Sequence, residues 1–588
     1  MKIRTLFLSC VLFALCAGFG EAQGPDPAPS TAATPTGFFT EVVDVRVIEV
    51  EVVVTDRSGV PVAGLGPEAF RLEVDGQPIP IANFYAEAGG LPRPSVATVE
   101  RRSDPSFTPV EDVETSPARR SYVVILIDHT RLRANNRKRA FEALREALGR
   151  LGQEDLVAVV GIQGSLVFYS DFLYDRQAIG RILDDASRVA PPSGISEAER
   201  RRIFGELARG MSGSYLAKIS PADEQALQAR IHAYAAEQYA RSLASLRQIE
   251  HVVSTLAGVP GRKAVLYVGE GIPTRPGEGM FVEWRNRFGG GSNAELGVRR
   301  FDFNSDYDRA IGRYDLTNPI NALSVTANRA GVALYAVDAE GDHGSEVRSA
   351  LTEQGATSET LSVVDENFRA PLESASKATG GRLLRSSGKL AEQLVEVLGD
   401  FDTYYSIGFT PPADWQPGSA HDIEVKVEGK RLVARHRDEI GLPRPDEREA
   451  SATVAALRYQ TADNPLEIRT APGTPIPRQD GTAALPLTIE IPMVNIELLP
   501  REGTHAGSLT IYVSTKDANG KASRVQKIPF NLAIPDDVIE EARTDSARYD
   551  LPLVLRRGDQ QVAIGIRDNL SGEFSAVRVD VARFSREL

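Results

Sequence analysis

Cysteine is nearly absent from this sequence. The 588 residues include two, Cys10 and Cys16, and both lie in the apolar N-terminal segment. If that segment is removed, the mature chain has no thiol, which excludes disulfides, thiolate nucleophiles and cysteine-ligated zinc. A secreted protein without disulfides must be stabilised by large apolar cores. The chain is long enough for about two to four domains with such cores.

Several other signals of chemistry are missing. Lys and Arg number 67 against 80 Asp and Glu, so the net charge of -13 excludes the basic footprint of a nucleic-acid binder. The seven histidines are scattered. No Gly-x-Ser-x-Gly elbow, His-Glu-x-x-His helix or phosphate loop of the Gly-x-x-x-x-Gly-Lys type is present. These absences leave little basis for predicting an enzyme.

The N-terminus has the pattern of a secretory signal. Lys2 and Arg4 precede an apolar segment, and Gly20-Glu21-Ala22 has the small-x-small pattern of a cleavage site. We therefore predict a signal peptide at 1–23 and a secreted or periplasmic protein; the alternative is an uncleaved membrane anchor. No later apolar run is long enough to span a bilayer, so we expect no membrane span in the mature chain.

Two short β-rich segments flank the centre of the chain. A Pro/Ala/Thr-rich linker at 24–40 comes first. Apolar and polar residues then alternate from Val45 to Val54, which is typical of a half-buried strand. The sequence is again typical of β-strands after residue 401. We therefore predict that 41–90 and 402–440 together form one β-sandwich. A polar stretch near Pro443 to Thr453 precedes a second predicted β-sandwich at 455–588, where Asn519-Gly520 predicts a hairpin turn.

The central region, 120–401, has a different pattern of apolar residues. Its four apolar runs, "YVVILID", "LVAVVGI", "AVLYVGE" and "VALYAVD", are continuous, as expected for parallel strands buried on both faces. Helical patterns separate them, which predicts a doubly wound, mainly parallel α/β sheet. An insertion at about 188–257 includes a long helix that starts near Ser220. This insertion is either a partner-binding cap or extra packing on the sheet.

Oxygen-bearing side chains gather where the predicted strands end. Asp128, Glu270 and Asp338 each end an apolar run, and Thr130 follows Asp128 closely. Ligands of open α/β sheets bind beyond the carboxyl ends of the strands, and hard cations prefer oxygen ligands. The simpler interpretation is that Asp128 caps the next helix and that all three acids lie in a solvated crevice. We expect His129 to be a lone exposed histidine.

The segments "VVILIDHT", "EDLVAVVGI", "GRKAVLYVGEGIP" and "ANRAGVALYAVDAEG" together resemble a von Willebrand factor type A domain. With the flanking "VVVTDRSGVPVAGLGPEAF" and "YYSIGFTPP", the chain is similar to the VWFA-related family of secreted bacterial proteins over about 44–437. The resemblance implies a Rossmann-like domain that binds proteins, in which a metal held by an Asp-x-Ser-x-Ser loop, a distant Thr and a distant Asp accepts a carboxylate from the partner.

By this resemblance, Asp128, Thr130 and Glu270 are the candidate ligands for Mg²⁺ or Mn²⁺. Two further positions depart from the pattern, because Leu132 stands at the second Ser and Leu173 at the distant Thr. His129 and Asp338 are candidates for the binding face around the site.

Three functions remain open from the sequence. The first is a non-enzymatic protein-binding or scaffold module with a degenerate metal-ion-dependent adhesion site. The second is a Mg²⁺- or Mn²⁺-dependent adhesion module. The third is a hydrolase that uses carboxylates in the same crevice. The protein partner is not identified by the sequence.

Overall fold

The computed structural model describes residues 47–581 except 89–90, 94–120, 150, 152–154, 191, 193–194, 210–220, 289–307, 310, 341–356, 386–389, 430, 460–462, 502, 518–521 and 557–559. The predicted signal peptide at 1–23, the linker at 24–40 and the Asn519-Gly520 turn lie outside these residues. Among the helices that are described, none is both long and apolar enough to cross a membrane.

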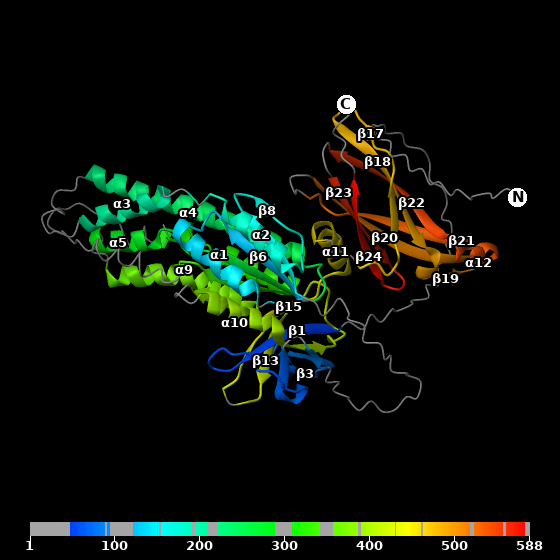
Figure 1. Cartoon of the computed structure of the whole chain (residues 1–588), viewed down its shortest axis with the longest axis horizontal. Coiled ribbons are helices and arrows are strands. Elements are labelled where there is room, and N and C mark those ends of the chain that lie inside the picture. The colour runs from blue at the N-terminus through cyan, green and yellow to red at the C-terminus, as the bar shows by residue number, and fades with distance from the viewer. Residues whose placement is uncertain are drawn as a thin grey trace, which may run out of the picture. The chain divides into compact units, whose positions relative to one another are not determined.

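A six-stranded sheet is the core of the α/β region (Figure 1). Its strands lie in the order β11-β10-β9-β6-β7-β8, and all neighbours are parallel except β7 and β8. Every residue of β6 and β7 is buried, so their apolar runs contribute to both faces of the sheet. The strands are β6 (Ser121–Asp128), β7 (Leu156–Ile162), β8 (Leu166–Phe168), β9 (Arg262–Gly269), β10 (Val332–Asp338) and β11 (Leu383–Arg385).

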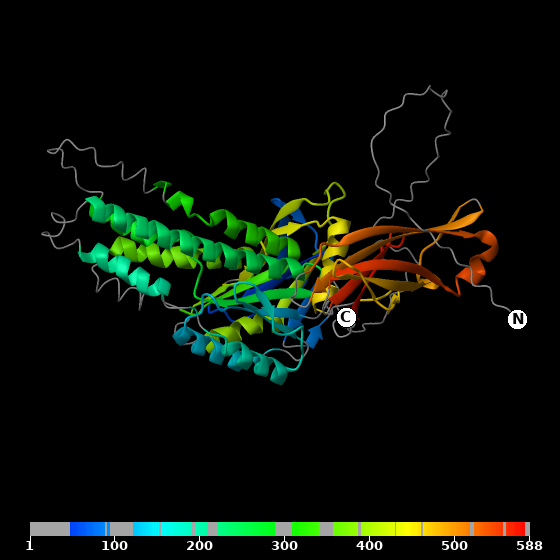
Figure 2. The same cartoon turned by 90° about the horizontal axis from the view of Figure 1, so that it is seen from above.

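Helices cover both faces of this sheet. Helices α1, α2 and α10 lie on one face, and α4 (Pro221–Leu256), α7 and α9 lie on the other (Figures 1 and 2). An apolar core joins each group of helices to its face of the sheet. This region of the chain is therefore a three-layer α/β arrangement with a mainly parallel sheet. The helices are α1 (Ala134–Leu148), α2 (Arg176–Ser187), α7 (Thr317–Ala330), α9 (Ser358–Ala378) and α10 (Leu390–Asp402).

The predicted insertion contains two helices, α3 (Ile195–Arg209) and α4 (Pro221–Leu256), of which α4 has 36 residues. The second half of α4 packs on the sheet through Leu246, Val253 and Leu256. Its first half forms a separate apolar core with α3 and α5 (Glu278–Phe288), in which Ile231 is fully buried. The insertion thus packs on the sheet at one end and builds a helical extension at the other.

Strands from before and after the α/β region pair with one another. β1 pairs antiparallel with β12, with Ile48 opposite Phe409, and β2 pairs with β13, with Val74 opposite Ile423. The two sheets, in the orders β14-β1-β12-β4-β5 and β15-β13-β2-β3, share one apolar core. Their strands are β1 (Ile48–Thr55), β2 (Phe70–Val74), β3 (Gln77–Ile79), β4 (Asn83–Ala88), β5 (Leu91–Arg93), β12 (Thr403–Phe409), β13 (Ala420–Val427), β14 (Val433–Arg435) and β15 (Glu439–Gly441).

The C-terminal region is also built from two antiparallel sheets around one core. Its long strands β18 and β22 pair over eleven residues, from Thr482 opposite Arg556 to Pro492 opposite Ser546. The strands are β16 (Arg469–Pro472), β17 (Ile476–Pro477), β18 (Thr482–Pro492), β19 (Leu499–Arg501), β20 (Thr504–Asp517), β21 (Gln526–Pro535), β22 (Ser546–Arg556), β23 (Gln560–Asp568) and β24 (Phe574–Val581), with the short helix α12 (Ile539–Ala542).

The polar stretch near Pro443 to Thr453 is not merely a separator. Most of it belongs to helix α11 (Pro445–Tyr459), which contacts β20, β23, β24 and α4. Its Glu449 carboxylate is 1% exposed and lies 2.9 Å from a guanidinium nitrogen of Arg567. A polar residue of this helix is therefore buried together with an oppositely charged partner.

A close backbone approach between β10 and β11 gives a test of this packing. A Cβ atom at Gly381 would lie 1.9 Å from the Leu334 carbonyl oxygen, so the backbone would have to move. We expect Gly381→Ala to lower the free energy of unfolding by about 1–3 kcal/mol, measured from the urea midpoint.

Gly180→Ala is the matched control, because Gly180 lies inside helix α2 and a Cβ there meets nothing within 4 Å. This control should raise the free energy of unfolding by roughly 0.5–1 kcal/mol. Equal urea midpoints for the two variants would contradict the described contact.

Candidate functional site

The predicted site residues lie at one edge of the central sheet. β10, β9 and β6 are parallel neighbours, with Asp338 opposite Gly269 in the register. Asp128 and Asp338 are therefore the last residues of their strands, and Glu270 follows the last residue of β9. The structure brings these three acids to the carboxyl edge of the sheet, together with the loop that carries His129 and Thr130.

Asp128 is held by four donors of the protein itself. One carboxylate oxygen accepts from the Thr130 backbone N–H at 3.0 Å and from the Thr130 hydroxyl at 2.6 Å. The other accepts from the Ser245 hydroxyl at 2.7 Å and from the Tyr267 hydroxyl at 3.1 Å. The side chain is 0% exposed. A buried carboxylate is tolerated when such bonds replace its lost hydration.

The expected helix cap and solvated crevice are both wrong. Helix α1 has Arg133 at its N-cap, and no side chain caps it from that position. Glu270 accepts a hydrogen bond from the Arg133 backbone N–H at 2.6 Å. The acid that bonds the backbone at the start of α1 is therefore Glu270 and not Asp128. Exposure is 0% for Asp128, 8% for Glu270 and 2% for Asp338, so none of the three acids lies in a solvated crevice.

Arg133 joins two acids at this edge. Its Nε lies 2.5 Å from Glu270 Oε2, and its Nη2 lies 2.6 Å from Glu340 Oε1. Asn136 Nδ2 donates to Glu270 as well, at 2.9 Å. Burial raises the pKa of Glu270, while the Arg133 charge lowers it. A guanidinium thus supplies the positive charge next to Glu270.

A second arginine of the same loop is buried. Arg131 is 9% exposed, and its guanidinium donates to the Gly271 carbonyl at 3.2 Å and to the Ser242 hydroxyl at 2.5 Å. Ser242 and Ser245 both come from α4, so the insertion contributes directly to this site. These two serines and the arginines are functional-site residues that the sequence analysis missed.

His129 is not the exposed histidine that the sequence suggested. It is 3% exposed, Arg137 Nη2 lies 2.7 Å from its Nδ1, and the Tyr169 hydroxyl lies 3.0 Å from its Nε2. Since a guanidinium only donates, Nδ1 must accept, which places the ring proton on Nε2. Burial, with a smaller effect of the Arg137 charge, lowers the pKa of His129 to about 4.

The residues at the strand ends do not fit a metal ion. Leu132 is 0% exposed and offers no oxygen, and Leu173 forms a backbone bridge with Val157. The oxygens of Asp128 accept from hydroxyl and amide groups, and those of Glu270 accept from Arg133 and Asn136. No group of three His, Cys, Asp or Glu among the described residues could hold a metal.

A groove of about 710 Å³ adjoins the site, between the Asp128 loop, the end of β7 and helix α4. Its lining combines polar groups with apolar carbon, including His129, Thr130, Gln163, Val189, Ala244 and Gln248. Ala244 and Gln163 are exposed in it. The groove, rather than the buried carboxylates, is the part of this edge that another molecule can reach.

Comparisons with known proteins identify no family. No family model matches the chain, and no curated protein sequence matches it. Among solved structures, a von Willebrand factor type A protein from Catenulispora acidiphila aligns at 12% identity and a TM-score of 0.20, over 79% of this chain and 66% of that one.

Two further likenesses come from Bacteroides. An aerotolerance-related membrane protein from Bacteroides fragilis aligns at 10% identity and a TM-score of 0.21, over 47% of this chain and 98% of that one. BatB from Bacteroides thetaiotaomicron aligns at 9% identity and a TM-score of 0.19, over 48% and 98%. Likenesses with scores this low carry no argument about function.

The buried His129 predicts an acid-sensitive stability. Its pKa is about 4 in the folded protein against 6.5 for an unperturbed histidine, so the unfolded chain binds its proton first. The stabilising effect of the neutral ring is complete above pH 6.5 and is lost as the pH falls toward 4. We expect the melting temperature of His129→Gln to fall less than that of the wild type as the pH decreases from 6.5 to 4. Equal decreases in the two proteins would show that protonation of His129 does not cause the acid sensitivity.

Proposed function

We propose that this chain is a secreted or periplasmic, non-enzymatic protein-binding or scaffold module. Its centre is a Rossmann-like, von Willebrand A-like domain flanked by two β-sandwiches, and its adhesion site is degenerate and works without a metal. One observation carries the proposal: Asp128 accepts four hydrogen bonds from the protein itself, and Glu270 is paired with Arg133.

A metal ion at this edge would have to displace donors that already bind the carboxylates. To ligate Mg²⁺, Asp128 would have to give up bonds to Ser245 and Tyr267, and Glu270 would have to leave Arg133. Mg²⁺ itself parts reluctantly with its water and demands a near-octahedral shell of oxygens. Leu132 supplies none of these oxygens. Binding Mg²⁺ would therefore break several hydrogen bonds and an ion pair, while the protein would supply few oxygen ligands to the metal.

The proposed binding face is the groove beside this site. Its floor is rigid, because the Asp128 loop is bonded to β9 through Tyr267 and to α4 through Ser245. A preformed, mixed polar and apolar surface of this kind suits a protein ligand. The same bonds make Asp128 a positioning residue for the loop rather than a contact for the partner.

The acids described at the strand ends are poorly placed for acid–base catalysis, and this supports a non-enzymatic role. A carboxylate hydrolase would need an accessible general acid or base within reach of its substrate. Asp128 and Asp338 are almost fully buried, and Glu270 is bound to Arg133. His129, with a pKa of about 4, is neutral and enclosed by Arg137 and Tyr169.

Metal binding is tested by calorimetric titration of residues 24–588 with Mg²⁺, Mn²⁺ and Ca²⁺. We expect no saturable binding to the wild type, because its carboxylates are occupied by protein donors. Asp128→Ala is the control for any signal that appears. Saturable binding that this variant abolishes would contradict the metal-free site and favour the Mg²⁺- or Mn²⁺-dependent adhesion module.

The groove is tested with two arginine substitutions on the same helix. Ala244 is exposed in the groove, whereas Ala236 is exposed on α4 outside it. We expect Ala244→Arg to weaken capture of the protein partner from the native secretome at least tenfold, in EDTA as well as in Mg²⁺, because its side chain fills the groove.

Ala236→Arg is the control for this experiment and should leave capture unchanged. Equal capture by both variants would remove the groove from the binding face. Capture that EDTA abolishes would favour the metal-dependent alternative instead.

A further inference from the structure

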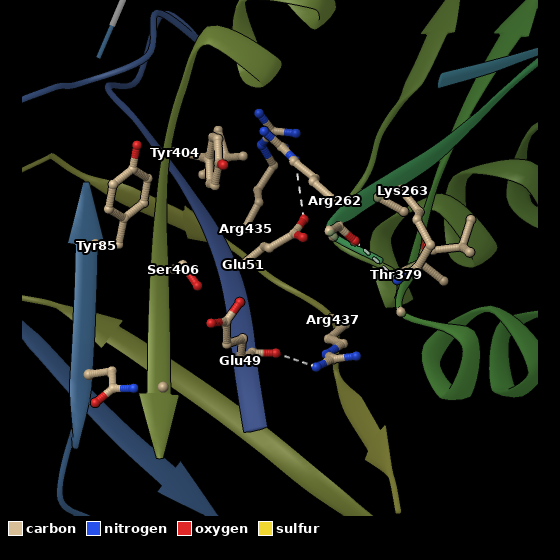
Figure 3. Close-up of a pocket in the computed structure, with 18 of the residues that line it drawn as sticks. Glu49, Glu51, Tyr85, Arg262, Lys263, Thr379, Tyr404, Ser406, Arg435 and Arg437 are labelled. Atoms are coloured by element: carbon tan, nitrogen blue, oxygen red, sulfur yellow. Dashed lines mark hydrogen bonds and ion pairs between the residues drawn. The ribbon is translucent and has the colours of Figure 1, made fainter. Parts of the chain in front are cut away.

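A second cavity lies at the opposite edge of the central sheet. It has a volume of about 650 Å³ and lies between the first residues of β9 and β10 and the face of the β1–β12–β4 sheet (Figure 3). Its polar lining includes Glu49, Glu51, Arg262, Lys263, Arg435 and Arg437. Small-molecule sites commonly occupy about 300–1,000 Å³ at junctions of this kind.

Two of the four cations are paired within the protein. Arg262 is 3% exposed, and its Nε lies 3.1 Å from Glu51 Oε2. Figure 3 marks this ion pair with a dashed line. Arg435 Nη2 lies 2.7 Å from Oδ1 of the buried Asp400. These pairs link the α/β region to the β-sheets formed by the segments before and after it. Arg262 and Arg435 therefore have a structural role whether or not a ligand is present.

The other two cations have no carboxylate partner among the described residues. Lys263 donates only to the Gly261 carbonyl, at 3.1 Å. Arg437 donates to the Asn328 carbonyl at 3.3 Å and to the Glu49 carbonyl. Burial lowers the pKa of Lys263 to about 8, and the charges of Glu51 and Glu49 offset this effect only in part.

Other hydrogen-bond donors on residues that line the cavity also have no acceptor among the described residues. They are Arg435 Nη1, Arg437 Nε and the hydroxyl of Tyr335, a residue that is 1% exposed. A buried donor without an acceptor destabilises the folded protein, because it has lost its hydrogen bonds to water. The cavity is thus rich in donors and in positive charge. Of the two acids that line it, Glu51 is paired with Arg262, whereas Glu49 is exposed.

We propose that this cavity binds a small molecule through an oxyanion, either a carboxylate or a phosphate, held by Lys263 and Arg437. An oxyanion offers several acceptors to the donors that lack one and balances the two cations that lack a carboxylate. A cationic ligand would meet four positive side chains against Glu49 and Glu51. The site is independent of the groove beside Asp128, which lies at the other edge of the sheet.

The test is calorimetric titration of residues 24–588 with inorganic phosphate and with succinate, at constant ionic strength. We expect saturable binding of at least one probe, and which probe binds more tightly identifies the preferred oxyanion. Lys263→Met removes the charge while keeping the apolar stem, and we expect at least a tenfold increase in Kd with no loss of thermal stability. Glu49→Gln should tighten binding, because it removes a negative charge near the opening.

Lys138→Met is the control, since Lys138 on α1 is 80% exposed and far from the cavity lining. It should leave the Kd unchanged. The proposal is overturned if neither probe binds saturably, or if Lys263→Met binds as tightly as the wild type. If Lys263→Met does not fold, Glu49→Gln decides alone, and an unchanged or larger Kd in that variant rejects the site.

Discussion

The fold around the candidate site depends on one constraint: a carboxylate ends the central strand of the sheet and is completely buried. Without compensation, such a charge would be too costly to keep. Thr130, Tyr267 and Ser245 provide the compensation. Because Ser245 comes from α4 and Tyr267 from β9, satisfying Asp128 also fixes the long insertion and the neighbouring strand in place.

The same principle recurs across the chain, with arginine as the usual partner. Arg133 lies between Glu270 and Glu340, Arg262 pairs with Glu51, and Arg567 with Glu449. Buried pairs of this kind contribute little net stability, but removing one partner is strongly destabilising. They therefore specify which segments meet. In a chain whose described part contains no cysteine, this pairing is one source of structural specificity.

The sequence predicts the elements well where their pattern is local. The run "YVVILID" corresponds to β6, and "VALYAVD" to β10, because strands buried on both faces must be continuously apolar. The alternation near Val50 corresponds to β1, where Val50 and Val52 enter the core while Glu49 and Glu51 face the cavity. Helix α11 was missed, because Glu449 looks like a solvated residue until Arg567 is seen beside it.

The site was predictable only in part, for a physical reason. That Asp128, Glu270 and Asp338 share one edge follows from parallel strands alone. Their burial does not, because it depends on groups far away in the sequence, such as Ser245 on a helix 117 positions later. His129 likewise looks exposed beside an acid, whereas Arg137 and Tyr169 enclose it. No local pattern encodes such contacts.

The most direct measurement of the central claim is anomalous X-ray scattering at the manganese edge, from crystals of residues 24–588 soaked in Mn²⁺. We expect no anomalous peak between Asp128, Thr130 and Glu270, with the Arg133 guanidinium in contact with Glu270. A strong peak at that position, with Arg133 displaced, would contradict it and would establish a metal site rebuilt from fewer protein ligands.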